Sequence, residues 1–312
     1  MPLSNGTPKA IKNIDIDWTR RGAYDNFARG ILCSIAASGI IVHPSIAATS
    51  DKIGSFEHPV AIIGGGGRTG MAVAEYLTGE SGQMYAVTMT RSGKDPFRII
   101  KLPSTNKDRL RHYDDIVDAT VKDSLHTAFQ EIKPSVVVYA ASASKQGGNS
   151  FDVDDRGVKN VAIECKNIGA KLILISALAL DRPESKSFQI TNTLGGYLDK
   201  IMEAKLNGEE NARSIMGSEY IIIRPGVLLS GKSKNGANDI ELNQGDTIGG
   251  GLSRDELSGI VVGAIQNGKY GITVEVYRKV TATKLQPEFS IPSGNELYAS
   301  SFEGLFKNTI KD

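Results

Sequence analysis

A glycine-rich segment between two apolar segments constrains the fold of this chain most strongly. Residues 64–70 read Gly-Gly-Gly-Gly-Arg-Thr-Gly, with glycines at the first, fourth and seventh positions. The apolar run Val60–Ile63 before it predicts a strand, and Thr69–Leu77 predicts a helix that follows at once. Helix N-termini bind phosphate through backbone N–H groups, and glycines allow the close approach. The segment predicts a dinucleotide-binding loop, with an ordinary strand-to-helix turn as the alternative.

Apolar runs alternate with helical patterns along most of the chain, which predicts an α/β fold. Strands are expected at Val60–Ile63, Tyr85–Met89, Ile116–Asp118, Ser135–Tyr139, Lys171–Ser176, Glu219–Ile223 and Thr273–Tyr277. Helices are expected at Thr69–Leu77, Asp123–Glu131, Val153–Ile168, Tyr197–Ile215 and Arg254–Gln266. Short β-branched strands that are apolar on both faces are typical of a buried parallel sheet with helices on each side. We therefore expect a Rossmann-type, doubly wound parallel sheet.

The chain is expected to form a single domain with two appended ends. We place the dinucleotide-binding domain at 56–285, after a leader at 1–55 and before a C-terminal tail at 286–312. The segment Ser230–Gly251 is rich in glycine, asparagine and lysine and predicts a surface loop. Together with the residues after Ser176, this loop is expected to line the substrate pocket, but its composition does not identify the substrate.

The leader has the order of a targeting sequence. Arg20 and Arg21 precede an uninterrupted apolar run of 13 residues, 30–42, and small residues follow at 45–48. The run suits a signal-peptide core better than a membrane span, and twin arginines suggest export of a folded protein. We expect a plastid location, thylakoid-associated or lumenal. A disordered arm with a membrane-anchoring helix is the alternative.

Charge and the metal-binding residue types exclude several kinds of partner. The formal net charge is +1, which argues against nucleic acid as a partner. The two cysteines, Cys33 and Cys165, are far apart, and the four histidines have no ligand spacing, so we expect neither a disulfide framework nor a metal site. Cys165 is expected to be a buried, unreactive side chain on a helix.

The end of the second expected strand bears on the choice between NADP(H) and NAD(H). An acid at this place binds the ribose 2′-hydroxyl of NAD, whereas an arginine accommodates the 2′-phosphate of NADP. The segment 83–93 contains no acid. Arg91 and Ser92, with Arg68 from the glycine loop, are expected to form a small anion site. This favours NADP(H), with NAD(H) less favoured; the alternative is that Arg91 is a solvated turn residue.

Small residues follow two other expected strands at the same edge of the sheet. Ala140 and Ala141 follow the fourth strand and would let a dinucleotide lie against the backbone, and Ser176 places a hydroxyl at the end of the fifth. Ligands of open α/β sheets bind at this edge. We expect these residues to contact the cofactor, although Ser176 could instead cap a turn.

Several of these motifs resemble those of a known family. They are the glycine loop at 64–70, Lys205 with Glu209, the run 218–226 ending in Arg-Pro-Gly, and the run 252–257. Residues 59 to about 278 resemble the atypical short-chain dehydrogenases/reductases, in the NmrA-like, biliverdin/flavin-reductase-like branch. Ser253 in the last run is also expected to cap a helix.

The resemblance implies a Rossmann fold and a nicotinamide cofactor. The residues that match the family's cofactor positions are Gly64, Gly67, Arg68, Thr69, Gly70, Lys205 and Pro225. Similar plastid members include the dinucleotide-binding subunit of the inner-envelope import machinery and several photosystem assembly factors. The resemblance therefore also implies a photosynthetic or envelope complex as a partner.

One departure from the family bears on catalysis. Catalytic members of the wider family carry a proton-donating tyrosine four residues before the active lysine, but Ile201 stands four residues before Lys205. Tyr197 lies one further turn upstream on nearly the same helical face and is the remaining candidate. The alternatives are that Tyr197 only packs or is exposed, and that Lys205 is an exposed lysine paired with Glu209.

Two functions remain open from the sequence. One is an NADPH-dependent reductase of a small conjugated or carbonyl substrate, with Lys205 and Tyr197 as catalytic candidates. The other is a non-catalytic dinucleotide-binding subunit that senses redox state or assists assembly. Ile201 favours the second, and the glycine loop with Arg91 is compatible with both.

Overall fold

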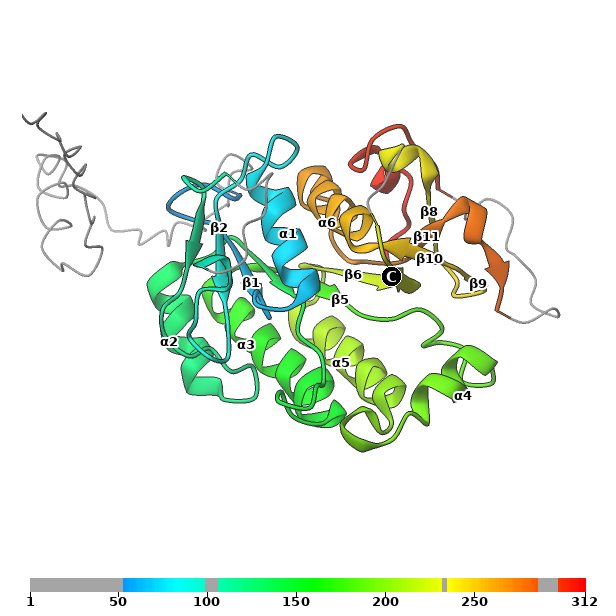
Figure 1. Ribbon diagram of the computed structural model, residues 1–312, viewed down its shortest axis with the longest axis horizontal. Coiled ribbons are helices and arrows are strands. Elements are labelled where there is room, and N and C mark those ends of the chain that lie inside the picture. Colours follow the sequence, from blue (N-terminus) through cyan, green and yellow to red (C-terminus); the bar gives the residue numbers. More distant parts are fainter. Residues whose placement is uncertain (1–52, 99–105, 232–234, 286–296) are drawn as a thin grey trace, which may run out of the picture. The chain divides into compact units, whose positions relative to one another are not determined.

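The computed structural model describes residues 53–98, 106–231, 235–285 and 297–312 (Figure 1). The expected targeting segment, with its apolar run at 30–42, lies outside the described residues. Within the described part of the chain, no helix combines the length and the apolar character needed to cross a membrane. The expected location of the protein therefore stays a prediction.

A mostly parallel sheet of eight strands forms the centre of the fold. In sheet order its strands are β3 (Leu110–His112), β2 (Ala86–Met89), β1 (Val60–Ile63), β4 (Val136–Tyr139), β5 (Lys171–Ile175), β6 (Tyr220–Pro225), β11 (Ile272–Arg278) and β8 (Ile240–Asn243). All neighbours pair in parallel except β8, which is antiparallel to β11. The order 3-2-1-4-5-6 confirms the predicted Rossmann-type, doubly wound sheet.

Helices cover both faces of the sheet because successive strand residues point to opposite sides. On one face, Val60 and Ile62 belong to a core formed with α1 (Arg68–Thr78) and α6 (Arg254–Asn267). These two helices lie side by side in front of the sheet (Figure 1). On the other face, Ala61 and Ile63 belong to a second core. Its helices are α2 (Lys122–Ile132), α3 (Val158–Ile168) and α5 (Ile201–Met216). Cys165 is fully buried in this second core, as expected.

The third strand differs from the prediction. The segment Ile116–Asp118 is not a strand, and β3 lies instead at Leu110–His112, paired with β2 at the edge of the sheet. Its Leu-Arg-His sequence is only partly buried, because an edge strand has a neighbour on one side alone. It therefore lacks the apolar run that marks a central strand in the sequence.

The segment Ser230–Gly251 was expected to be a surface loop, and this prediction is wrong over much of its length. It contains the fully buried strand β8 and the short strand β9 (Ile248–Gly249), which pairs with β12 (Thr283–Lys284). On β8, Ile240 and Leu242 lie in the main core, while the alternate residues are polar. A second small pair joins β7 (Val227–Leu229) to β10 (Gly251–Ser253).

The expected helix at 197–215 is interrupted. Helix α5 begins only at Ile201, after Lys200, whose backbone is left-handed with a φ of 55°. The Asn192 side chain, at the end of the unpredicted helix α4 (Lys186–Asn192), accepts hydrogen bonds from the N–H groups of Met202 and Glu203. This side-chain cap gives α5 its N-terminus.

Helix α6 begins as the sequence indicates. Ser253 Oγ accepts a hydrogen bond from Glu256 N, and the Glu256 carboxylate accepts one from Ser253 N. This reciprocal pair is a capping box, which confirms Ser253 as the cap.

The end of the chain packs against the domain. Leu305 and Phe306 are buried in the core beside α6, and Leu297 pairs with Leu242 of β8. Residues 297–312 thus contribute to the fold, although an appended tail was expected at 286–312.

Candidate functional site

The glycine loop connects β1 to α1, and two of its glycines, Gly64 and Gly70, leave no room for a side chain. A Cβ on Gly64 would lie 2.8 Å from Ala141 N, and one on Gly70 would lie 2.4 Å from Gly64 O. Gly64 also has a φ of 79°, which favours glycine. Gly67 precedes α1 and gives it no side-chain cap, so the first N–H groups of the helix have no capping side chain. This is the arrangement that binds phosphate.

A cavity of about 650 Å³ opens in front of this loop. Its walls come from the glycine loop and from the ends of β2 and β4, with the loop after β3 and the residue Val153. Of the expected cofactor residues, it contains Gly64, Gly67, Arg91, Ser92, Ala140 and Ala141. The volume is in the range of small-molecule and cofactor sites.

Four cavity residues after β2, Thr90, Arg91, Ser92 and Lys94, are polar or basic. Thr90 follows β2 and is buried, whereas Arg91 and Lys94 are exposed. No described acid forms an ion pair with either cation, although Asp95 also lines the cavity and its carboxylate accepts a hydrogen bond from Phe97 N. This end of the cavity therefore presents positive charge.

Arg68 does not line this cavity, so the structure does not join it with Arg91 and Ser92. It lies near Arg254 at the start of α6, since burial and then the charge of Arg68 lower the pKa of Arg254. Thr69 and Gly70 do not line the cavity either. Gly70 instead packs against the backbone oxygen of Gly64, which brings the two ends of the glycine loop together.

Other residues of the cavity were not predicted from the sequence. Asp118 lies in the loop after β3, where its carboxylate accepts hydrogen bonds from the N–H and hydroxyl of Thr120. Ser142 and Gln146 lie in the loop after β4. The irregular loop at 116–118 resembled a strand because Ile116 and Val117 are apolar.

Lys205 is neither exposed nor paired with Glu209, which corrects that alternative. Its Nζ lies 2.6 Å from Asp154 Oδ1, and the two side chains are 14% and 1% exposed. Both line a narrow space, too small for a water molecule, together with Ser176, Tyr139 and hydrophobic side chains. The Ser176 hydroxyl is buried and has no hydrogen-bond partner within the described structure. The structure therefore brings Lys205 and Ser176 together, with Asp154 as an unpredicted third member.

Asp154 belongs to a π-helical segment, Phe151–Gly157, that runs directly into α3. This segment places Val153 in the cofactor-sized cavity and Asp154 beside Lys205. Its Val153 carbonyl accepts a hydrogen bond of 2.6 Å from the Tyr139 hydroxyl, and burial raises the pKa of Tyr139. π-Helical turns are rare and occur often at functional sites.

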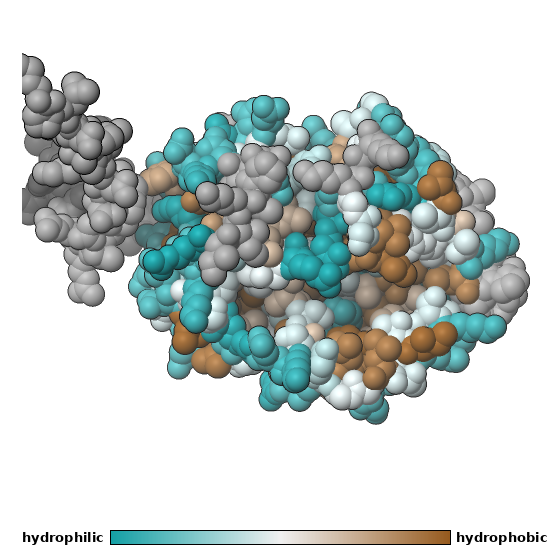
Figure 2. All heavy atoms as spheres, in the orientation of Figure 1, coloured by the Kyte–Doolittle hydropathy of each residue, from teal (hydrophilic) through white to brown (hydrophobic). Residues whose placement is uncertain are grey.

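Tyr197 lies outside α5, in the short turn Gly196–Leu198. Tyr197 is 43% exposed, and the nearby residues Ile190 and Leu194 are more exposed still. Figure 2 shows apolar surface in the region that α4 occupies in Figure 1. The structure does not place Tyr197 in the narrow space beside Lys205, so the two residues are not on one helical face. Ile201, by contrast, is buried among apolar side chains.

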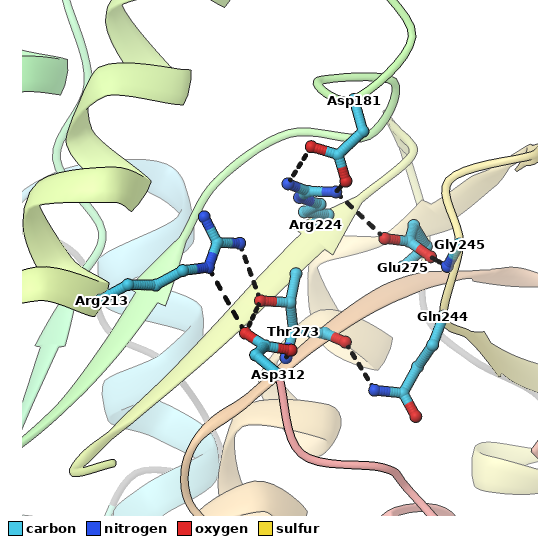
Figure 3. A pocket seen from close by; sticks show the side chains of 8 residues that line it. All are labelled: Asp181, Arg213, Arg224, Gln244, Gly245, Thr273, Glu275 and Asp312. Atoms are coloured by element: carbon cyan, nitrogen blue, oxygen red, sulfur yellow. Dashed lines mark hydrogen bonds and ion pairs between the residues drawn. The ribbon is translucent and has the colours of Figure 1, made fainter. Parts of the chain in front are cut away.

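Pro225 lies at the end of β6, outside the described cavities, beside a buried charge cluster centred on Arg224 (Figure 3). The Arg224 guanidinium donates hydrogen bonds to Glu209, Asp181 and Glu275. Burial would lower the pKa of Arg224, but these carboxylates outweigh it and raise the pKa. Arg224 thus holds α5, the loop after β5 and β11 together.

A second cavity, of about 280 Å³, lies on this cluster. Arg213 and Asp312 face it from one side in Figure 3, and Arg224 and Glu275 from the other. Asp312 accepts hydrogen bonds from Arg213, Tyr220 and Thr273. The polar side chains that line this cavity are therefore already paired with one another. Burial, and then the charge of Asp246, raise the pKa of Glu275 to about 8.

The larger cavity fits a nicotinamide dinucleotide. Gly64, which lines it, leaves no space that a Cβ could occupy, an uncapped helix N-terminus faces it, and basic side chains line one end. No group of His, Cys, Asp and Glu side chains among the described residues is arranged to hold a metal ion.

Comparisons with known proteins agree with this geometry. A family described as NAD(P)H-binding matches residues 64–268. No curated protein matches the chain. A Rossmann-fold NAD(P)-binding family protein from Shigella flexneri is 19% identical with a TM-score of 0.53, over 75% of this chain and 100% of that chain.

Two further similar structures carry bound cofactors. A short-chain dehydrogenase/reductase (wide type) from Veillonella parvula, in complex with NADP, is 14% identical with a TM-score of 0.55, over 74% of this chain and 98% of that chain. The Bordetella bronchiseptica enzyme WbmG, in complex with NAD, is 16% identical with a TM-score of 0.51, over 72% of this chain and 74% of that chain. At these identities the likeness shows the fold.

Proposed function

The chain belongs to the NAD(P)H-binding family, and on that premise we propose that it is an NADPH-dependent reductase of the atypical short-chain dehydrogenase/reductase type. Its substrate would be a small conjugated or carbonyl compound. When bound, the cofactor supplies a hydride. The glycine loop would hold the pyrophosphate, and Ala140 and Ala141 would lie against the dinucleotide.

The end of β2 carries the proposed preference for NADP(H) over NAD(H). A 2′-phosphate adds negative charge to the adenosine ribose, and Arg91, Ser92 and Lys94 offer it a guanidinium, a hydroxyl and an ammonium group. Thr90 stands directly after β2, where NAD-binding proteins carry an acid. The NAD in the WbmG structure and the NADP in the Veillonella parvula structure are properties of those two proteins. The proposal here rests on the side chains at the end of β2.

A titration of the purified protein with NADPH and NADH tests this preference. We expect NADPH to bind more tightly, and Arg91→Ala to weaken NADPH about 10-fold while changing NADH little, because one charge-assisted contact is lost. Arg98→Ala is the matched control, since Arg98 is exposed and lies outside the cavity. Tighter binding of NADH by the wild type would overturn the preference.

A second function is favoured by one observation. Ile201 is 4% exposed and packs with Phe188 and Leu180, so the position of the usual proton donor is occupied by an apolar core residue. A protein without a proton donor there could bind the dinucleotide as a redox-sensing or assembly subunit. NADPH consumption with a panel of flavins, quinones and tetrapyrroles separates the two. Tight NADPH binding without turnover would favour the subunit.

We also propose that residues 1–55 direct the protein to a plastid, in association with a photosynthetic or envelope complex. The twin arginines and the apolar run at 30–42 support this proposal. Import of the full chain into isolated chloroplasts, with Arg20→Lys and Arg21→Lys together as the control variant, tests it. Failure of the wild type to enter the organelle would contradict the proposal.

A further inference from the structure

Two parts of the chain that the sequence predicts to line the substrate pocket meet in the structure. One is the loop after β5, which carries Leu178, and the other is β9, which carries Gly249. A Cβ on Gly249 would lie 3.8 Å from Leu178 Cδ2 and 2.9 Å from Cδ2 of Leu285, which follows β12. Both leucines therefore converge on this glycine. We use the name apolar wall for three partly exposed residues, Ala177, Leu178 and Leu285.

The apolar wall lies at the edge of the sheet toward which a bound dinucleotide would extend. The strands β1, β4, β5 and β6 are parallel, so their C-terminal ends share one edge. The cofactor-sized cavity occupies this edge from β2 to β4 and contains the proposed 2′-phosphate site. The nicotinamide end would therefore extend toward β5 and β6. Apolar residues follow both strands there, with Ala177 and Leu178 after β5 and Val227 after β6.

A buried apolar cluster joins the apolar wall to the cofactor-sized cavity. Ala143, Leu180 and Ile201 belong to this cluster, and the three residues of the wall pack against it. Ala143 stands between Ser142 and Ser144, which both line the cavity. Ile201 is at the position of the usual proton donor. The wall is thus continuous with the place where the reacting atoms would lie.

The loop that carries Leu178 is fixed in a strained conformation. Ala179 has a φ of 75° and Asp246 a φ of 53°, in the left-handed region that favours glycine. The buried Asp246 carboxylate accepts hydrogen bonds of 2.7 and 2.8 Å from the N–H groups of Ala179 and Asp181. Strain of this kind is concentrated at functional sites. Because these N–H groups are paired inside the protein, Ala177 and Leu178 are the partly exposed residues of 177–180.

We propose that the substrate is a conjugated compound with an apolar substituent that packs against the apolar wall, and that Leu178 determines this specificity. The inference rests on the proposed reductase function and names the class of its substrate. Burial of one CH₂ group strengthens binding about fourfold. A polar substituent would lose its hydrogen bonds to water at the wall, because alanine and leucine side chains offer no partner.

Equilibrium dialysis against the NADP⁺-loaded protein tests the apolar wall without turnover. The probes are 2,3-dimethoxy-5-methyl-1,4-benzoquinone and the same quinone with one isoprene unit on its free ring carbon, so that only the apolar substituent differs. We expect the substituted quinone to bind the wild type at least about tenfold more tightly. Equal affinities, or no binding of either probe, would overturn the proposal.

Leu178→Asn places a polar amide of similar size in the apolar wall. We expect the preference for the substituted quinone to fall below about threefold, with the melting temperature and the NADPH Kd near those of the wild type, because Leu178 is partly exposed and outside the cofactor-sized cavity. Leu285→Asn should have the same effect from the other side of the wall. Leu178→Met stays apolar and should keep the preference.

Ile310→Asn is the matched control, since Ile310 is 67% exposed and its backbone pairs with Gln244 after β8. This variant should keep the full preference for the substituted quinone. If Ile310→Asn and Leu178→Asn lose it equally, the probe adsorbs to exposed apolar surface in general, and the proposal fails.

Steady-state reduction of the two quinones by NADPH separates this inference from the reductase function. If both quinones are reduced with equal KM, the reductase function stands and the specificity of the wall fails. If neither is reduced while the preference still depends on Leu178, the reductase function fails and the wall stands as a binding site for an apolar ligand. Sedimentation as a dimer that Leu178→Asn dissociates, with neither quinone bound, would assign the wall to a second copy of the chain and overturn the proposal.

Discussion

The Arg224 guanidinium lies 2.6 Å from the Glu209 carboxylate, and both side chains are almost completely buried. This pair joins β6 to α5, and Arg224 also contacts Asp181 and Glu275. A buried charge is costly to leave alone, so the members of such a cluster depend strongly on one another.

Arg224→Met should destabilise the fold by about 3–5 kcal/mol, because it leaves several buried carboxylates without a cation. Arg156→Met is the control. Arg156 pairs with Asp152 one turn away, but its side chain is 65% exposed, and such pairs contribute about 0.3–0.5 kcal/mol. Urea unfolding of both variants measures the difference. Equal losses would contradict the buried-cluster interpretation.

Glu275 should make stability depend on pH. Its pKa is raised to about 8 in the folded protein, first by burial and then by Asp246, from an ordinary value of 4.5. The folded state therefore binds more protons than the unfolded state between these values. Stability should fall as the pH rises through this window, by up to about 1.4 kcal/mol per pH unit.

Glu275→Gln removes the titrating group while keeping an oxygen for the N–H groups of Gly245 and Asp246. We expect urea unfolding of this variant to vary less with pH than that of the wild type between about pH 5.5 and about pH 8. Glu210→Gln, at an exposed position of α5, is the control. Parallel pH profiles for the wild type and Glu275→Gln would refute this account.

Two glycines of the loop should respond differently to alanine. In Gly70→Ala the new Cβ would lie 2.4 Å from the backbone oxygen of Gly64, so we expect a loss of about 1–3 kcal/mol from overpacking, together with weak NADPH binding. In Gly66→Ala the Cβ would lie 3.2 Å from the end of the Thr90 side chain, which can move. This variant should keep its melting temperature and lose NADPH affinity. A stable, binding-competent Gly70→Ala would exclude the proposed closure of the loop.

The C-terminal segment should be needed for stability. Phe306 is fully buried beside α6, and Phe306→Ala should cost about 3–5 kcal/mol. Ile310 is 67% exposed, and Ile310→Ala should change stability by less than about 0.5 kcal/mol. Thermal unfolding measures both. A negligible effect of Phe306→Ala would mean that this segment is not part of the cooperative fold.

Central elements could be predicted because their sequences carry local patterns. Val60–Ile63 is apolar throughout since helices cover both of its faces, and Ser253 with Glu256 forms a capping box within four residues. Strand β8 also carries a local pattern, since Ile240 and Leu242 alternate with polar residues. It was not predicted because the glycine and asparagine residues around it indicate a loop. The break before α5 could not be predicted from the sequence. Lys200 adopts a left-handed backbone there, and a lysine does not indicate such a conformation as a glycine would.

The pairing of the candidate site could not be predicted in the same way. Lys205 and Asp154 are 51 positions apart, and nothing near either residue identifies the other as its partner. The i,i+4 spacing made Glu209 the natural choice, but Glu209 faces the buried guanidinium of Arg224 instead. Local spacing gives candidate partners, and the packing of α5 on the sheet decides among them.

The π-helical segment Phe151–Gly157 has a consequence for how such a site could arise. Its wide turns hold more residues than an α-helix needs for the same rise. Deleting a single residue between Asp154 and α3 would restore an ordinary α-helix and turn the preceding side chains, that of Asp154 included, by about 100° relative to α3. Asp154 would then face away from Lys205 while the sheet and α3 stayed in place. A one-codon insertion or deletion in a lineage would therefore be enough to give this lysine an acidic partner or to remove it.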